Sequence, residues 1–179
     1  LDQNVPIGIV NASLGGSPIE AWMHKDILSP YPDKIAAGER FADPAVDKQT
    51  RKDDKARSDS WYAKLHQSDE GLQSEVKWYD PELDDSAWQA ITMPGNLPTN
   101  GKEFIGVWWL RKTLHLDEVP AEPVTLRLGR IVDADTAYIN GHEVGGTGYQ
   151  YPPRRYNVTP DMLKKGENVI AIRITSDGG

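Results

Sequence analysis

After about Trp78 the sequence contains several stretches in which apolar residues recur at every second position, and this period constrains the fold of the chain more than any other feature of its sequence. The stretch GVWWLRKTLHL (106–116) carries tryptophan and leucine on one face, VTLRLG (124–129) alternates in the same way, and NVIAIRIT (168–175) carries isoleucines on one face. Alternation of this kind is typical of half-buried β-strands. Because these stretches are short and no long helical pattern separates them, they predict a mainly β fold, an antiparallel β-sandwich.

Two turn signals lie between the predicted strands. Asn140-Gly141 predicts a tight β-hairpin, because a type I′ turn needs positive φ at both of its central residues. The stretch TPDMLKKGEN predicts one helical turn, which Thr159 caps, Pro160 begins and Gly166 ends.

The N-terminal stretch VPIGIVNASLGGSPIEAWM (5–23) predicts a different structure, a buried strand followed by a glycine turn and a helix. The strand is the apolar run at 5–10. The residues Ser-Pro-Ile-Glu at 17–20 have the pattern of a capping box with proline at the first helical position. We expect this helix to end near Leu28, before two prolines.

The turn Gly15-Gly16-Ser17 is the first candidate site. Backbone N–H groups at a glycine turn and a helix N-terminus suit an anion or a developing oxyanion. The same residues suit a plain tight turn, and they match neither the dinucleotide-binding pattern nor a P-loop. The local pattern alone therefore favours the plain turn.

Residues 30–77 are polar, and DKQTRKDDKARSD (47–59) alternates in sign, with Asp47/Arg51 and Asp53/Arg57 four residues apart. This charge pattern predicts a solvated helix without a functional role. The sequence thus divides into a strand–turn–helix segment at 1–29, a polar, partly helical connector at 30–77 and a β-sandwich at 78–179.

Composition excludes several classes of site. The net charge of −7 disfavours binding to nucleic acid or anionic lipid, and no apolar run is long enough to span a membrane. The absence of cysteine removes disulfides, thiolate metal sites and thiol nucleophiles.

Other chemistry-bearing residues form no motif. Ser13 and Ser17 lie outside the G-x-S-x-G pattern, and the four histidines are scattered. Asp133 and Asp135 are expected in a loop, because the other positions of a calcium loop would be apolar. The residues predict no metal site and no cofactor.

Two parts of the sequence together resemble a known family. VPIGIVNASLGGSPIEAW resembles the second conserved block of sialate O-acetylesterases of the SGNH hydrolase superfamily. DDSAWQAITMPG, FIGVWWLRKTLHL, LRLGRIVDADTAYINGHEVGGTGYQYPPRRYNV and MLKKGENVIAIRI resemble the galactose-binding-like, jelly-roll β-sandwich inserted in that esterase fold. The resemblance implies a fragment of a partial α/β hydrolase segment and its inserted sandwich.

The resemblance also implies a reaction and its residues. The parent protein would be a serine carboxylic-ester hydrolase that removes acetyl esters from sialic acid by acyl transfer. Gly16 or Gly15 would donate an oxyanion-hole N–H, and Glu20 and Trp22 would lie near the acyl pocket. The nucleophile and the Asp/His pair of the family are missing from this chain, so the fragment itself is expected to be inactive.

The implied partners are acetylated sialic acid or a related sugar and the remainder of the hydrolase domain, with no nucleic acid and no membrane span. The expected location is secreted or periplasmic in a bacterium, although no signal peptide opens this sequence. The alternative is a carbohydrate-binding or structural β-sandwich module, as in β-galactosidase-type glycoside hydrolases. Such a module would hold sugar through exposed aromatic residues such as Trp109, Tyr149 or Tyr151.

Overall fold

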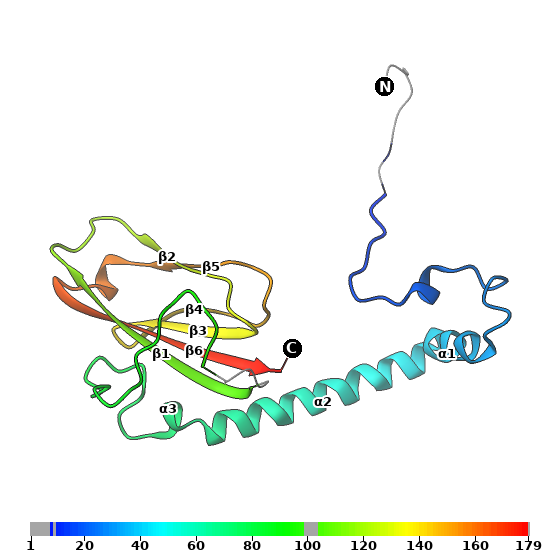
Figure 1. Cartoon of the computed structure of the whole chain (residues 1–179), viewed down its shortest axis with the longest axis horizontal. Helices are drawn as coiled ribbons and strands as arrows, with labels where there is room; N and C mark the ends of the chain where they lie inside the picture. The colour runs from blue at the N-terminus through cyan, green and yellow to red at the C-terminus, as the bar shows by residue number, and fades with distance from the viewer. Residues whose placement is uncertain (1–7, 9, 99–103, 179) are drawn as a thin grey trace, which may run out of the picture. The chain divides into compact units, whose positions relative to one another are not determined.

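The computed structural model describes residues 8, 10–98 and 104–178. The chain divides into two compact units, Leu1–Asp59 and Ser60–Gly179, and the boundary falls inside a long helix. The helical elements are η1 (Ile19–Trp22), α1 (Pro32–Ala42), α2 (Pro44–Ser68), α3 (Glu70–Gln73) and η2 (Pro160–Met162), and the strands are β1 (Ile105–Leu116), β2 (Val124–Gly129), β3 (Ala134–Ile139), β4 (His142–Thr147), β5 (Arg154–Val158) and β6 (Gly166–Asp177) (Figure 1).

The N-terminal unit contains less regular structure than its sequence predicts. Most of the expected strand, including Val5, Ile7 and Ile9, lies outside the described residues, and Val10 is in neither strand nor helix. The predicted helix to Leu28 is wrong, because only the 3-10 turn η1 forms.

The reason lies in the hydroxyl group of Ser17, which does not cap a helix. Ser17 Oγ donates to the Leu14 carbonyl at 2.6 Å and accepts from Trp22 Nε1 at 2.7 Å. The first residue before η1 is Pro18, which makes no side-chain cap, so the capping box is not formed.

The charge-alternating stretch forms α2, a helix without a single buried residue, as the sequence predicts. Arg51 Nε lies 2.9 Å from Asp47 Oδ2, which is the predicted i,i+4 pair. The predicted pair of Asp53 and Arg57 is wrong, because Arg57 contacts Asp54 instead. No described helix is long and apolar enough to cross a membrane.

The second unit is an antiparallel β-sandwich. One sheet has four strands in the order β1-β6-β3-β4, and the other pairs β2 with β5 (Figure 1). All pairings are antiparallel. The mainly β, antiparallel sandwich predicted from the two-residue period is therefore confirmed.

The hairpin predicted at Asn140-Gly141 is also present. Both residues have positive φ, 48° and 87°, as a type I′ turn requires. The Asn140 side chain fixes the turn further, because Nδ2 donates to the Met162 carbonyl at 2.8 Å and Oδ1 accepts from the Val169 N–H at 2.9 Å.

Both faces of the four-stranded sheet are covered. The face that carries Asp135, on β3, meets β5, whose Tyr156 hydroxyl lies 2.7 Å from the Asp135 carboxylate. The opposite face carries Trp109, Tyr138 and Ala171, and the segment before β1 packs against it through Leu72, Trp78, Tyr79 and Trp88. Mostly aromatic side chains from the segment before β1 therefore cover this face of the sheet and extend the hydrophobic core.

Candidate functional site

A buried arginine fixes the loop between β4 and β5. Arg154 is the first residue of β5, and its side chain is fully buried. Its Nη1 donates to the Pro152 carbonyl at 2.7 Å, and its Nη2 donates to the Ile131 carbonyl at 2.7 Å and the Asp133 carbonyl at 3.1 Å. One guanidinium therefore holds two loops in a fixed arrangement, because its donors lie in a rigid planar fork.

The charge of this arginine is balanced by a buried carboxylate. Arg154 Nε donates to Asp135 Oδ1 at 2.6 Å, and neither side chain is exposed to solvent. Asp135 Oδ2 accepts from the Tyr156 hydroxyl at 2.7 Å, and Thr147 Oγ1 lies 3.0 Å from the same hydroxyl. Burial raises the pKa of Tyr156 from 10.0 to about 12, so its hydroxyl stays a donor at alkaline pH, where a solvated tyrosine ionises. The network leaves no charge of the pair unbalanced, as buried charges require.

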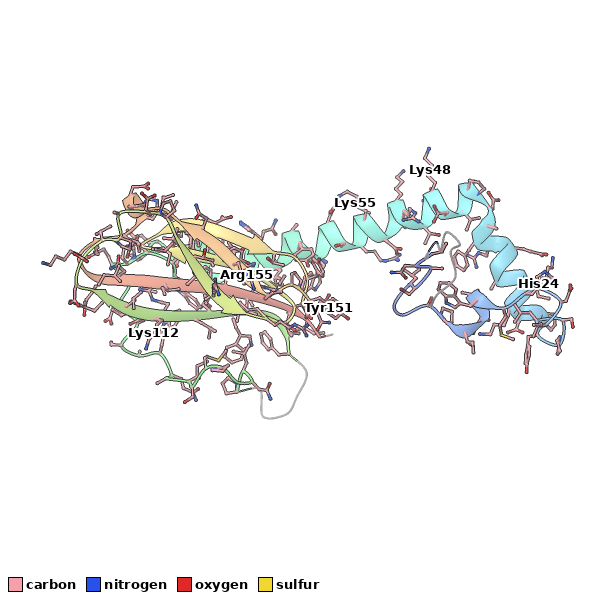
Figure 2. The ribbon with its side chains drawn as sticks, turned by 90° about the horizontal axis from the view of Figure 1, so that it is seen from above. His24, Lys48, Lys55, Lys112, Tyr151 and Arg155 are labelled. Carbon is pink, nitrogen blue, oxygen red and sulfur yellow. The ribbon has the colours of Figure 1, made fainter. Side chains whose placement is uncertain are left out.

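The loop held by Arg154 carries two exposed aromatic residues. Tyr149 is 60% exposed and Tyr151 is 65% exposed, and their ring centroids lie 6.4 Å apart at an interplanar angle of 62°. Figure 2 shows Tyr151 at one end of the sandwich, on the loop that leads into the strand carrying Arg155. Large aromatic side chains left in water on a fixed loop are typical of a binding surface, because tyrosine loses little conformational entropy on contact.

We define Tyr149 and Tyr151 as the aromatic platform. A pyranose ring has an apolar face of C–H groups and an edge of hydroxyl groups. A tyrosine offers an apolar ring for the first and a hydroxyl for the second. The aromatic platform therefore has the chemistry to hold a sugar ring.

The third aromatic candidate, Trp109, is not available to a ligand. It is 6% exposed, and its Nε1 donates to Asp69 Oδ1 at 2.9 Å. It lies on the sheet face that the segment before β1 covers. The proposal from sequence that Trp109 holds sugar is therefore wrong.

The sequence-predicted residues of the N-terminal turn lie together but form no complete site. Gly16 has φ of 77°, as a tight turn requires, and Gly15 precedes it. Ser17 links this turn to Trp22 through its hydroxyl, and Trp22 is 53% exposed. Glu20 pairs with Lys34 at 2.7 Å, and this hydrogen bond lowers the pKa of Glu20.

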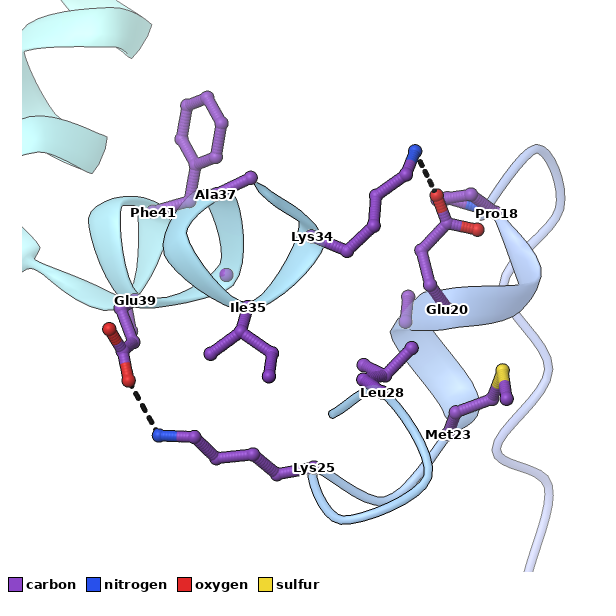
Figure 3. A pocket seen from close by; sticks show the side chains of 13 residues that line it. Pro18, Glu20, Met23, Lys25, Leu28, Lys34, Ile35, Ala37, Glu39 and Phe41 are labelled. Carbon is purple, nitrogen blue, oxygen red and sulfur yellow. Dashed lines mark hydrogen bonds and ion pairs between the residues drawn. The ribbon is translucent and has the colours of Figure 1, made fainter. Parts of the chain in front are cut away.

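Thirteen residues between Pro18 and Ala42 line an open cavity of about 640 Å³, shown in Figure 3. Its lining is mostly apolar, and ion pairs of Lys34 with Glu20 and of Lys25 with Glu39, at 2.5 Å, flank it. None of the lining residues is a serine, a histidine or a cysteine. The described lining of the cavity therefore supplies no serine nucleophile and no imidazole base for acyl transfer.

Asp135 and Arg154 carry the site, and neither was singled out from the sequence as a site residue. The sequence predicts Asp135 in a loop, and this prediction is wrong. Asp135 lies in β3, and the residue is 6% exposed. The sequence does contain a signal for the buried pair. Asp135 lies at the same alternate positions as Ala137 and Ile139, and Arg154 lies at the same alternate positions as Tyr156. Two opposite charges at inward positions predict a buried ion pair. Within residues 8, 10–98 and 104–178 no cluster of three or more metal-ligating side chains is present.

Comparison with known proteins gives similar structures but no sequence family. No protein-family model matches the chain, and no curated protein matches it significantly. A Bacteroides uniformis β-glucuronidase 2, covalently bound to cyclophellitol-6-carboxylate aziridine, is 29% identical, with a TM-score of 0.49 over 55% of this chain and 12% of that one. A family 2 glycosyl hydrolase from Bacteroides cellulosilyticus is 24% identical, with a TM-score of 0.48 over 56% of this chain and 15% of that one.

These similar structures correct the resemblance noted in the sequence. The chain is similar to a β-sandwich domain of family 2 glycoside hydrolases, and it spans less than a fifth of the length of either enzyme. The identification of a sialate O-acetylesterase fragment is therefore wrong, and so is the assignment to the serine carboxylic-ester hydrolases. The oxyanion role of Gly15 and Gly16 and the acyl-pocket role of Glu20 and Trp22 stay predictions that no observation tests.

Proposed function

We propose that this chain is a carbohydrate-binding β-sandwich module of a larger carbohydrate-active hydrolase, in which it holds the substrate and does no chemistry itself. The observation that carries the proposal is the aromatic platform of Tyr149 and Tyr151 on a loop that Arg154 fixes.

The fixed loop matters for affinity. Binding by a mobile loop loses free energy because the loop must become ordered, and a loop already held in place avoids this loss. Here the Pro152 carbonyl, next to Tyr151, accepts a hydrogen bond from a fully buried guanidinium. The two rings are therefore presented to solvent in one arrangement, as a sugar-binding surface needs.

The N-terminal unit supports the second half of the proposal, that the module belongs to a larger protein. No residue among 8 and 10–59 is buried, although the unit contains many large apolar side chains. Those exposed most are Val10, Leu14, Ile19, Trp22, Ile27, Tyr31 and Phe41, at 53% to 89%. Monomeric proteins rarely leave so much apolar surface in water, so we propose that this unit packs against another domain of the parent protein.

The test is binding of the purified chain to a panel of neutral and acidic oligosaccharides, measured by isothermal titration calorimetry. We expect Tyr149→Ala and Tyr151→Ala each to weaken binding by about tenfold, the loss of roughly one aromatic contact. The matched control is Tyr62→Ala, which removes a 45% exposed tyrosine from α2.

Binding that Tyr149→Ala and Tyr151→Ala leave unchanged would overturn the aromatic platform. Absence of binding to every oligosaccharide of the panel would overturn carbohydrate binding altogether, and the sandwich would then act as a structural brace. Circular dichroism of each variant shows whether the sandwich is still folded.

A further inference from the structure

The outer face of the β2–β5 sheet carries two arginines that lie directly opposite each other. The antiparallel register pairs Arg127 of β2 with Arg155 of β5. Both arginines are exposed. The neighbouring pair, Leu126 and Tyr156, lies on the inner face of the sheet. Directly opposite side chains share one face of a sheet, with Cβ atoms about 4.5–5.5 Å apart.

This arrangement is unfavourable unless something balances it. Like charges directly opposite each other destabilise a sheet. Five of the other seven arginines pair with an aspartate: Arg51, Arg57, Arg111, Arg154 and Arg173. Among the described residues, neither Arg127 nor Arg155 forms a hydrogen bond or an ion pair through its side chain. The pair is a local positive site on a chain of net charge −7.

The next outward pair adds neutral hydrogen-bonding groups. Thr125 lies opposite Asn157, and both are exposed. Because residues two apart on a strand share a face, these four side chains form one polar strip. The strip of Thr125, Arg127, Arg155 and Asn157 therefore offers two guanidinium forks with a hydroxyl and an amide beside them.

The strip and the aromatic platform are neighbours along the chain. Arg155 directly follows Arg154, the residue whose guanidinium holds the loop of Tyr149 and Tyr151 (Figure 2). The chain that presents the rings therefore continues into the strand that presents the second arginine. A ligand long enough to extend along β5 from the loop would meet a charged group after an aromatic one.

We infer that the polar strip binds an anionic group, a carboxylate or a sulfate ester, on a polysaccharide whose sugar rings the aromatic platform holds. The inference rests on the proposed function. Guanidinium groups match planar or tetrahedral oxyanions through paired, charge-assisted hydrogen bonds. The ligand class that follows is an acidic polysaccharide rather than a neutral one.

The experiment compares three polymers on the full chain by affinity electrophoresis and calorimetry: polygalacturonate for carboxylate, dextran sulfate for sulfate, and neutral galactan. We expect the double variant Arg127→Gln/Arg155→Gln to lose about tenfold or more in affinity for at least one acidic polymer, because charge-assisted hydrogen bonds are lost. Its affinity for neutral galactan should not change. The acidic polymer that loses affinity identifies the group that the strip binds.

The matched control is Lys48→Gln/Lys52→Gln, which removes two exposed positive charges from α2. An equal loss with this control, equal binding of a DNA duplex, or unchanged affinity of the arginine variant would each overturn the inference. These results differ from failure of the proposed function, which appears as insensitivity of neutral-glycan binding to Tyr149→Ala and Tyr151→Ala.

Discussion

Asp69 and Arg173 lie 104 residues apart in the sequence, and the Asp69 carboxylate accepts a hydrogen bond from Arg173 Nε at 2.6 Å. The second oxygen of the same carboxylate accepts from Trp109 Nε1 at 2.9 Å. Trp109 and Arg173 are direct partners across β1 and β6. One nearly buried carboxylate therefore fastens the segment before the sandwich strands to both residues of a cross-strand pair.

Loss of the Asp69 charge should destabilise the sandwich. In Asp69→Asn, Arg173 keeps its charge in a largely buried place without its partner, so the free energy of unfolding should fall by about 3–5 kcal/mol. Urea denaturation followed by tryptophan fluorescence measures this change. The control Asp47→Asn breaks an exposed pair and should leave the free energy of unfolding almost unchanged, because solvent screens such pairs. Equal stability of the two variants would show that Asp69 is not a structural anchor.

A methyl group at Gly71 should also be destabilising. A Cβ added there would lie 2.4 Å from Trp109 Nε1, which is closer than van der Waals contact allows. The indole cannot move away easily, because it is hydrogen-bonded to Asp69. We expect Gly71→Ala to cost about 1–3 kcal/mol, the usual range for overpacking. Gly148→Ala is the control, because nothing lies within 4 Å of its added Cβ. A Gly71→Ala protein with the melting temperature of the parent chain would contradict this packing.

The buried pair of Arg154 and Asp135 should behave as a unit. Arg154→Met leaves a buried carboxylate without its partner and should cost about 3–5 kcal/mol. Adding Asp135→Asn removes that charge, so the double variant should be more stable than Arg154→Met alone. Chemical denaturation of the four proteins of this double-mutant cycle gives the coupling energy. Additive effects would mean that the two side chains do not interact.

Alkaline pH should weaken the sandwich through two buried tyrosines. Burial raises the pKa of Tyr138 and of Tyr156 to about 12, above the ordinary value of 10.0. Between these values the unfolded chain releases phenolic protons that the folded chain keeps, so the free energy of unfolding falls as pH rises. The stabilisation is fully present below pH 10 and is lost by about pH 12.

Denaturation at several pH values between 9 and 12 measures this slope. Tyr156→Phe should reduce the slope by about half, because one of the two titrating groups is removed. A parent chain whose stability does not change over this range would contradict the shifted pKa values.

The sandwich could be predicted because its signals are local. Alternation marks the strands, and the Asn140-Gly141 turn needs a backbone conformation that few other residue pairs adopt. The face of Trp109 could not be predicted in this way. Trp108 and Trp109 are adjacent, so alternation assigns them to opposite faces without saying which face is covered by a segment from elsewhere in the chain.

The site was harder to predict than the fold, for a related reason. Exposure of Tyr149 and Tyr151 follows from a loop conformation that the Arg154 guanidinium fixes through backbone carbonyls. The sequence does not show which backbone carbonyls will accept these hydrogen bonds, because every residue has a carbonyl group. The helix predicted at 17–28 is wrong for a similar reason. The Ser17 hydroxyl can cap a helix or bond elsewhere, and in the structure it bonds to Leu14 and Trp22.

The strand order has a consequence for how the protein is made. β6 follows the other described strands in the chain, yet it lies between β1 and β3. Until β6 has been synthesised, β1 has no neighbour in its sheet, and the Asp69 carboxylate lacks Arg173, its partner 104 residues later in the chain. Chains whose contacts join distant segments fold slowly and expose strand edges meanwhile. The four-stranded sheet can therefore form completely only after β6 has left the ribosome. Until then the edges of its earlier strands are unpaired and prone to aggregation.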